Sequence, residues 1–404
     1  MGRRRIEVAA FLRPRPRVPV MAPSPQHDCV VVGASFAGLA CATALARAGL
    51  RVAIVEKKSD VGAKLHTTGI IVKDAIDQIA LLDGLPHELC RRIGGVRLYA
   101  PNLRHVDLAA PGYYFLATDT PGVMRWLAAR ACEAGATLQK RTVFCDAVRT
   151  RSGFDLPGIG STRYLVGADG PNSKVAKVLG LGRNRRFLFG VEHEFQSAPI
   201  PEPDRLHCFI DRTIARGYIA WVVPGVGITQ VGLARRALSA IDADGAMRAL
   251  LSKIVPVFDF RSVRPSAIRA GLIPCGGVVD PTATRRALLV GDAAGMVSPV
   301  TAGGIHTALK HGMAAGHAIA DYLHGRAEDP SVDFVRSYPR FRAKRALRFL
   351  YDHFQSDVVF NLFLATAPMR QAASLVYFHH KGVFEPGRRE SKTREAPAPR
   401  ASAR

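Results

Sequence analysis

One stretch near the start constrains the fold of this chain more than any other. Residues 28–56 read DCVVVGASFAGLACATALARAGLRVAIVE. A short apolar strand runs into a glycine-rich turn, an alanine-rich helix follows, and a second apolar strand ends at Glu56, 23 positions after Gly33. This order of elements, with an acidic residue closing the second strand, predicts a Rossmann-like βαβ unit that binds a dinucleotide.

The small residues of the turn have distinct roles in such a unit. Gly33 permits the tight turn, and Gly38 lets the helix approach the strand. Ser35 replaces the usual middle glycine, and we expect its hydroxyl to assist phosphate binding at the helix N-terminus. Glu56 can accept hydrogen bonds from a ribose, and an acid here disfavours a 2′-phosphate, so the ligand is FAD or NAD(H). The candidate cofactor ligands of this unit are Gly33, Ser35, Phe36, Ala37, Gly38, Glu56 and Lys57.

Two later segments indicate which of these two ligands the chain binds. They are YLVGADGPNS (residues 164–173) and LLVGDAAGMVSPVTAGGIHTAL (residues 288–309). One glycine turn followed by distant Gly-Asp segments favours a long ligand across the sheet, which predicts FAD. Asp292 would bind the ribityl hydroxyls unless it is only a turn residue, and the next helix would direct N–H groups toward the flavin ring. The further candidate ligands are Asp169, Gly291, Asp292, Gly303, Gly304 and Ile305.

With these three motifs, the chain resembles the flavoprotein superfamily of aromatic hydroxylases, halogenases, lycopene cyclases and geranylgeranyl reductases. The resemblance covers residues 28–325. Hydroxylases commonly have His after Gly-Asp-Ala-Ala, where this chain has Gly295, and AGGIHTALKHGMAAG is most similar to the geranylgeranyl reductase family. The resemblance implies that reduced FAD saturates isolated double bonds of isoprenoids on membrane lipids or their prenyl precursors.

Other positions depart from the family pattern. RGYIAWVVP (residues 216–224) is similar to a Tyr-x-Trp-x-Phe-Pro motif on the sheet that lines the substrate cavity, but its two aromatic residues lie one position further apart. Tyr218 and Trp221 therefore either contact substrate or belong to an ordinary core strand. Thr120 stands where many relatives have a flavin-contacting Arg. His66 is either a proton donor or a solvated loop residue.

The motifs and strand-like runs predict an α/β fold in which a Rossmann-like FAD-binding domain carries an antiparallel β-sheet substrate domain and a C-terminal helical segment. The predicted FAD-binding domain is discontinuous and comprises residues 28–65, 115–182 and 280–326. The substrate domain comprises residues 66–114 and 183–279. Helices are expected over residues 331–384, with a disordered basic N-terminus (residues 1–26) and a disordered tail (residues 385–404).

The basic composition has a local explanation. The formal net charge is +23, but much of it lies in the ends, where residues 1–27 contain six Arg and one Glu. Without a zinc-finger spacing or RNA-binding motif, we expect no nucleic-acid partner and no metal. The seven Cys are widely spaced without a CxxC pair, which predicts free thiols, and no apolar run is long enough to span a bilayer, so we expect a cytoplasmic protein.

The stretch 336–354 leaves membrane contact open. It places Arg336, Arg340, Lys344 and Arg348 at i,i+4 spacing, before the apolar run VVFNLFLATAP. A basic stripe beside apolar residues can dock on an anionic membrane surface. The alternative, which the sequence slightly favours, is the solvated face of an ordinary packed helix.

Three functions remain open from the sequence. The first is an FAD-dependent reductase of an isoprenoid or similarly apolar small molecule, with electrons from NAD(P)H or a small electron-transfer protein and catalytic residues not yet identified. The second is an FAD-dependent monooxygenase acting on a small apolar or aromatic substrate. The third is a flavin-binding or membrane-associated scaffold without turnover.

Overall fold

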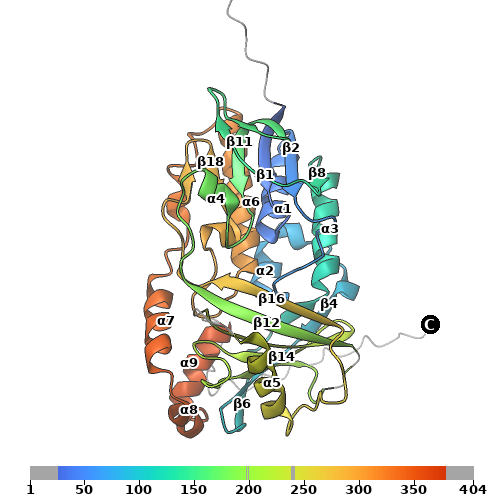
Figure 1. Cartoon of the computed structure of the whole chain (residues 1–404), viewed down its shortest axis with the longest axis vertical. Coiled ribbons are helices and arrows are strands. Elements are labelled where there is room, and N and C mark those ends of the chain that lie inside the picture. The colour runs from blue at the N-terminus through green and yellow to red at the C-terminus, as the bar shows by residue number, and fades with distance from the viewer. Residues whose placement is uncertain (1–25, 197, 199, 238–241, 379–404) are drawn as a thin grey trace, which may run out of the picture.

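The protein is built on two large β-sheets, one above the other in an elongated body (Figure 1). The computed structural model describes residues 26–196, 198, 200–237 and 242–378. The predictions of disorder for residues 1–26 and 385–404 lie outside the described residues, except for Gln26. No helix in the described ranges is long and apolar enough to cross a bilayer.

The upper sheet is the predicted Rossmann-like sheet. Its core strand β1 (His27–Val32) pairs in parallel with β2 (Val52–Glu56) and β11 (Gly160–Gly167). These strands are almost wholly buried and rich in Val, because helices and loops cover both faces of a parallel sheet. The outer strands are β18 (Ala287–Leu289), β17 (Ala283–Thr284), β8 (Thr137–Lys140), β10 (Phe154–Leu156) and β9 (Val148–Arg149).

Two glycines let the main helices of this sheet pack in contact. Helix α1 (Phe36–Arg47) lies against α6 (Ile305–Leu323). A methyl group added at Gly316 would come within 2.6 Å of the Cys41 carbonyl oxygen, and one at Gly312 would overlap the Ala37 carbonyl. The remaining helices of this part are α3 (Thr120–Glu133), α2 (Lys73–Gln78), α4 (Lys174–Val178) and the 3-10 turns Ala80–Leu82, His87–Leu89 and η3 (Gly291–Ala294).

The lower sheet contains the predicted antiparallel strands. Its order is β16 (Ala267–Pro274), β12 (Phe187–Gln196), β15 (Ile228–Arg236), β14 (Ala220–Pro224), β13 (Arg205–Phe209), β5 (Gly95–Tyr99) and β6 (His105–Leu108). Only β13 and β5 pair in parallel. Alternate residues of β14 enter different clusters: Val222 packs toward α5 (Ala243–Ile254), and Val223 packs toward the C-terminal helices. The predicted fold class is confirmed.

One predicted boundary cuts through a third, small sheet. Strand β7 (Phe115–Thr118) pairs antiparallel with β3 (Ile70–Val72) and β4 (Cys90–Ile93). The division at residue 115 would place β7 in a different domain from its partners. The domain boundaries, including this one, remain predictions.

The C-terminal segment forms α7 (Arg342–Phe354), α8 (Asp357–Phe363) and α9 (Ala367–Phe378) beside and below the lower sheet (Figure 1). The predicted four-residue basic stripe on one helix is wrong. Residues 334–337 form a 3-10 turn (η4, Phe334–Ser337), and α7 begins only at Arg342, after Phe341 with a φ of 50°. Arg348, predicted to be solvated, is buried.

Candidate active site

The glycine turn after β1 is closed against the end of β11. Gly33 has a φ of 104°, and a methyl group there would overlap the Ala168 carbonyl oxygen. The Ser35 hydroxyl caps α1 by accepting from the Gly38 N–H at 3.2 Å, and it donates to the Ala168 carbonyl at 3.0 Å. The hydroxyl proton therefore has an acceptor within the protein, and a role of Ser35 in phosphate binding stays a prediction. The backbone N–H groups of the α1 N-terminus remain the candidate phosphate donors.

Glu56 is buried at the end of β2 beside this turn. Its two carboxylate oxygens accept from the Ala34 N–H at 3.0 Å and the Lys58 N–H at 2.9 Å. Each oxygen keeps a lone pair for a ribose hydroxyl, because a carboxylate has about four acceptor positions. The neighbouring Lys57 is exposed, so it can reach only the outer edge of this site.

The second and third motifs are joined by a residue that the sequence did not single out. The Asn184 side chain donates to the carbonyl of Asp292 at 2.8 Å and to that of Pro171 at 3.0 Å. One oxygen of Asp169 accepts from the Lys174 and Val175 N–H groups, while its other oxygen is buried without a partner in the described residues. A buried carboxylate oxygen without a donor is expected where a bound cofactor would supply that donor.

Asp292 lies where the third motif meets the N-terminus of α6. Burial raises the pKa of its carboxyl group to about 6. A methyl group added at Gly304 would come within 3.5 Å of an Asp292 carboxylate oxygen and within 3.2 Å of Val297. Gly291 is needed in its turn because its φ is 59° and an added methyl group would lie 2.8 Å from that of Ala37.

The loop between Asp292 and α6 is held by its own hydrogen bonds. The Ser298 N–H donates to the Gly303 carbonyl at 3.1 Å, and the Ala302 N–H donates to the Ser298 carbonyl at 2.9 Å. Gly304 caps α6 without a side chain, and Ile305 begins the helix, so the first N–H groups of α6 have no side-chain partner at the cap. A helix N-terminus in this state can stabilise negative charge on a flavin ring.

Tyr218 and Trp221 belong to one apolar cluster with part of this loop. Both side chains, like Ala302 of the loop, pack against the buried cluster of Leu188, Ala234 and Cys275. The Tyr218 hydroxyl donates to the Thr301 carbonyl, so this side chain is directed toward the loop between Asp292 and α6 (residues 293–304, named the flavin loop below for its predicted role). The Trp221 ring lies over Gly232, where an added methyl group would stand 2.5 Å from the ring. These two aromatic residues, from the lower sheet, and the loop, from the upper one, therefore form one apolar wall.

The same wall contains a buried acid that the sequence did not single out. Glu192 of β12 accepts from the Thr68 hydroxyl at 2.6 Å, the Trp221 indole N–H at 2.9 Å and the Gln230 amide at 3.2 Å. Burial raises the pKa of its carboxyl group, although the hydrogen bonds from Thr68 and Trp221 oppose the shift. The available signal was the pair Glu192 and Glu194, which fall on one face of a mostly apolar strand and are both buried.

Two departures noted in the sequence have simple structural outcomes. Thr120 is buried at the start of α3, 3.2 Å from the Thr118 hydroxyl, and the next cation on that helix, Arg125, is paired with Asp60 at 2.6 Å. His66 is exposed, and its ring lies beside Gly271 of β16.

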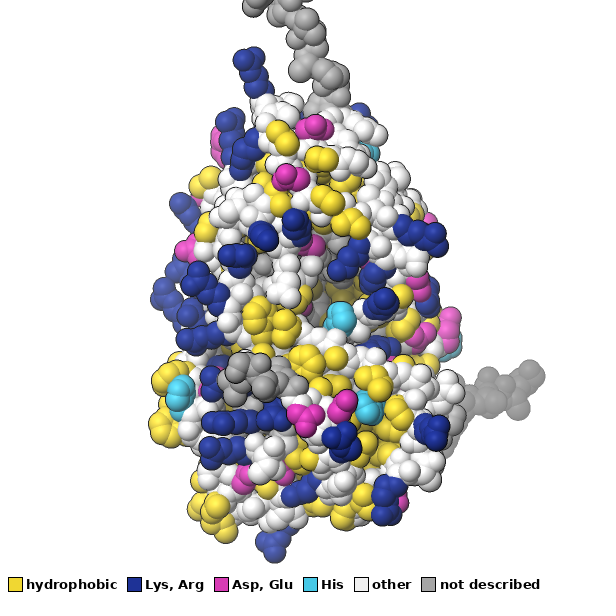
Figure 2. All heavy atoms as spheres, in the orientation of Figure 1, with side chains coloured by type: hydrophobic (Ala, Val, Ile, Leu, Met, Phe, Trp, Pro, Cys, Tyr) yellow, Lys and Arg dark blue, Asp and Glu magenta, His cyan; other side chains and the backbone are white. Residues whose placement is uncertain are grey.

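The surface of the molecule is hollowed in the middle of the face shown in Figure 2, between the upper and lower parts of the molecule.

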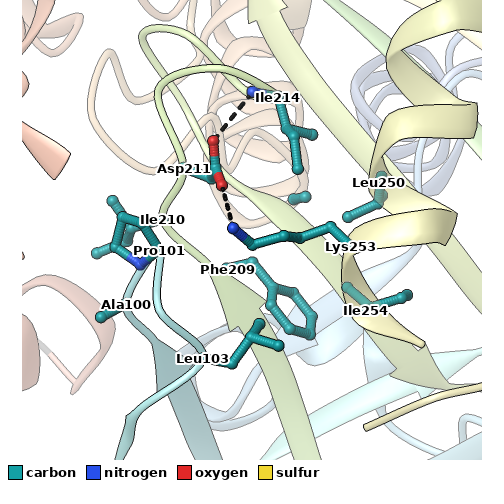
Figure 3. Close-up of a pocket in the computed structure, with 11 residues that line it drawn as sticks. Ala100, Pro101, Leu103, Phe209, Ile210, Asp211, Ile214, Leu250, Lys253 and Ile254 are labelled. Atoms are coloured by element: carbon teal, nitrogen blue, oxygen red, sulfur yellow. Dashed lines mark hydrogen bonds and ion pairs between the residues drawn. The ribbon is translucent and has the colours of Figure 1, made fainter. Parts of the chain in front are cut away.

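A small cavity on the other face of the lower sheet is not a substrate site (Figure 3). Its volume is about 10 Å³, which is room for a single water at most. Its polar groups already have partners: Asp211 accepts from the Ile214 N–H at 3.2 Å and pairs with Lys253 at 3.4 Å.

A larger pocket of about 280 Å³ lies beside the second motif, between α4 and Ala293. Lys177, Arg183 and Arg185 line it, and no ion pair within the described residues occupies them. The sequence signal was the run RNRR at residues 183–186, which follows the second motif. The pocket can hold the phosphates of a ligand that visits the cofactor region.

Comparison with known proteins identifies the family and the cofactor of this chain. A model of the FAD binding domain matches residues 26–350. Digeranylgeranylglycerophospholipid reductase 2 of Methanopyrus kandleri is 29% identical over 329 residues, which cover 78% of this chain and 81% of that protein. A geranylgeranyl bacteriochlorophyll reductase-like protein of Thermoplasma acidophilum has the same fold, with a TM-score of 0.74 at 17% identity over 88% of this chain and 97% of that one.

A probable FAD-dependent monooxygenase of Pseudomonas aeruginosa also shares the fold, with a TM-score of 0.62 at 19% identity, over 83% of this chain and 98% of that one. The resemblance to the geranylgeranyl reductase family, the FAD cofactor and the oxidoreductase class are confirmed by these matches. The chain belongs to the FAD binding domain family.

Proposed function

We propose that this FAD-dependent oxidoreductase saturates carbon–carbon double bonds of an isoprenoid or similarly apolar substrate. The observation that carries the proposal is the apolar wall between the lower sheet and the flavin loop, in which one carboxyl group, Glu192, is buried beside Trp221. An apolar alkene needs a dry site with a single proton source. The names of the reductases similar to this chain support the same reaction class.

The bound flavin would be held by groups on both sides of the glycine turn. We propose that Glu56 binds the ribose and the N-terminus of α1 binds the pyrophosphate. Asp292 and Asp169 would accept from hydroxyl groups, since each has a carboxylate oxygen without a hydrogen-bond donor in the described residues. Reduced FAD supplies a hydride to one carbon of the double bond.

The proton for the other carbon is assigned in this proposal to Glu192. Its raised pKa keeps more of the carboxyl group protonated near neutral pH than an exposed Glu would be. Thr68, Trp221 and Gln230 hold the carboxyl group in one position. Tyr218 and Trp221 would orient the isoprenoid chain and exclude water.

The electron donor is proposed to be NAD(P)H or a small electron-transfer protein. The pocket lined by Lys177, Arg183 and Arg185 supports NAD(P)H, because a dinucleotide carries phosphates. We further propose peripheral contact with a membrane, because prenylated lipids reside in bilayers.

The test is an assay of the FAD-loaded enzyme with geranylgeraniol and a geranylgeranylated lipid, read by mass spectrometry. Anaerobic reaction of chemically reduced enzyme should add two hydrogens for each double bond reduced, and oxidised enzyme serves as the control. Insertion of oxygen in air, with no anaerobic reduction, would establish the monooxygenase alternative instead. No conversion of either substrate under either condition would reject the proposed substrate class.

A further inference from the structure

We propose that helices α7, α8 and α9 form a membrane-docking surface for anionic lipid. The inference deepens the proposed membrane contact and relies on the proposed function only for the identity of the lipid substrate. Among the described residues, fourteen large apolar side chains are exposed, and nine of them lie between Leu347 and Leu375. A cluster of this kind on a water-soluble surface marks a binding site for an apolar partner.

Helix α7 is inverted relative to an ordinary surface helix. Its one buried residue is Arg348, which pairs with Asp352 at 2.8 Å. Leu350 and Phe354, on the opposite side, are 52% and 74% exposed. A helix packed for water alone turns its apolar side inward. The polar contacts of α7 with the protein therefore fix its apolar side toward an outside partner.

Polar groups lock α7 in this orientation. The Gln355 side chain accepts from the Gly217 N–H at 2.8 Å, and the Tyr351 hydroxyl donates to the Tyr218 carbonyl at 3.2 Å. Rotation of α7 to bury Leu350 would break both hydrogen bonds and would expose the Arg348 pair. The apolar side continues onto α8, where Val358 and Leu362 are 65% and 66% exposed.

The charge around this surface fits anionic lipid better than a second copy of the chain. Arg342, Arg345 and Arg370 are exposed on α7 and α9. The acids of these helices are occupied, since Asp352 pairs with Arg348 and Asp357 accepts from the Arg212 N–H at 2.9 Å. Figure 2 shows Lys and Arg side chains next to apolar ones along the lower left edge, where Figure 1 places α7 and α8. Two such cationic surfaces would repel each other, whereas anionic headgroups attract them.

The docking surface lies directly behind the candidate site. Tyr351 of α7 contacts the backbone of Tyr218, and the side chain of Tyr218 contacts Thr301 in the flavin loop. A lipid chain leaving a bilayer at α7 would therefore meet the apolar wall after one layer of side chains. This arrangement lets the enzyme take a membrane lipid without removing its headgroup from the interface.

The test is sedimentation of the FAD-loaded protein with vesicles of phosphatidylglycerol or phosphatidylcholine. The double variant Leu350→Ser with Phe354→Ser should weaken binding to phosphatidylglycerol vesicles by at least about tenfold. The matched control, Val143→Ser with Val148→Ser, removes two apolar side chains of similar exposure from the upper part of the molecule and should bind like the wild type. Retained FAD absorbance shows that each variant is folded.

Substitutions of single arginines measure the electrostatic contribution to vesicle binding. Arg342→Gln and Arg345→Gln should each weaken binding to phosphatidylglycerol vesicles about fivefold at low salt, with little change on phosphatidylcholine. Arg151→Gln and Arg248→Gln are the controls. Absence of vesicle binding by the wild type, or equal binding by the α7 variant, would overturn the proposal. A wild-type dimer that the α7 variant converts to a monomer without lipid would overturn it in favour of a second copy. Vesicle binding requires no turnover, so its failure is distinct from failure of the proposed reaction.

Discussion

The carboxyl group of Asp292 should destabilise the protein when FAD is absent. Burial is the cause that raises its pKa from 3.8 to about 6. Because the pKa is higher in the folded state, the carboxyl group does not destabilise the folded state below pH 3.8, where it is protonated in both states. The loss of folding free energy grows as the pH rises and is complete above about pH 6. One pKa unit corresponds to about 1.4 kcal/mol, which gives roughly 3 kcal/mol near neutral pH. Since the side chain keeps some exposure, we expect about 2 to 3 kcal/mol.

The test is the free energy of unfolding of FAD-free wild type and Asp292→Asn, measured with urea across a pH series. The variant should be more stable than the wild type by about 2 to 3 kcal/mol at about pH 7, and the difference should fall to about half at about pH 5. It should also bind FAD at least about tenfold more weakly, because a hydrogen bond to a charged carboxylate is replaced by a weaker one to a neutral amide oxygen. Asp146→Asn, at an exposed aspartate, is the control and should change neither quantity. A variant of equal stability, or a difference that does not depend on pH, would refute the reasoning.

Three further predictions concern individual residues. Glu56→Gln should weaken FAD binding by about ten- to a hundredfold, measured by titration calorimetry, because a charge-assisted hydrogen bond is weakened; unchanged affinity would exclude Glu56 as the ribose ligand. Glu192→Gln should lower the rate of product formation by at least about a hundredfold while flavin reduction by dithionite is unchanged, and it should remove the fall in rate at high pH that deprotonation of Glu192 causes; a retained pH profile would assign the proton elsewhere. Gly232→Ala should displace the Trp221 ring and raise KM several-fold without changing FAD affinity, because the added methyl group meets the ring at 2.5 Å; a normal KM would remove Trp221 from the substrate wall.

The parts of the site that the sequence predicts depend on local chemistry. Gly33, Gly38 and Glu56 lie within one βαβ unit, so their spacing alone indicates how they meet. Asp292 and the glycines before α6 form a similar local unit. The strands of the lower sheet can also be predicted from the sequence, because each is an apolar run between two turns.

The remaining features depend on contacts between distant segments. Glu192 reaches Trp221 because β12 and β14 both pair with β15, with Gly232 opposite each residue. Asn184 joins two motifs 121 positions apart through its side-chain amide. Helix α7 is the clearest example, because its amphipathic periodicity is the same whether its apolar side faces the protein or the solvent. Only the contacts of Arg348, Tyr351 and Gln355 determine which side faces the protein.

The most direct test of the central claim is whether an isoprenoid reoxidises the flavin of this enzyme without oxygen. Reduced, FAD-loaded protein is mixed anaerobically with a geranylgeranyl substrate, and the blue absorbance of oxidised flavin is followed. The absorbance should return in proportion to the double bonds saturated, and more slowly in Glu192→Gln. A flavin that stays reduced with every isoprenoid, and is reoxidised only when air is admitted, would contradict it.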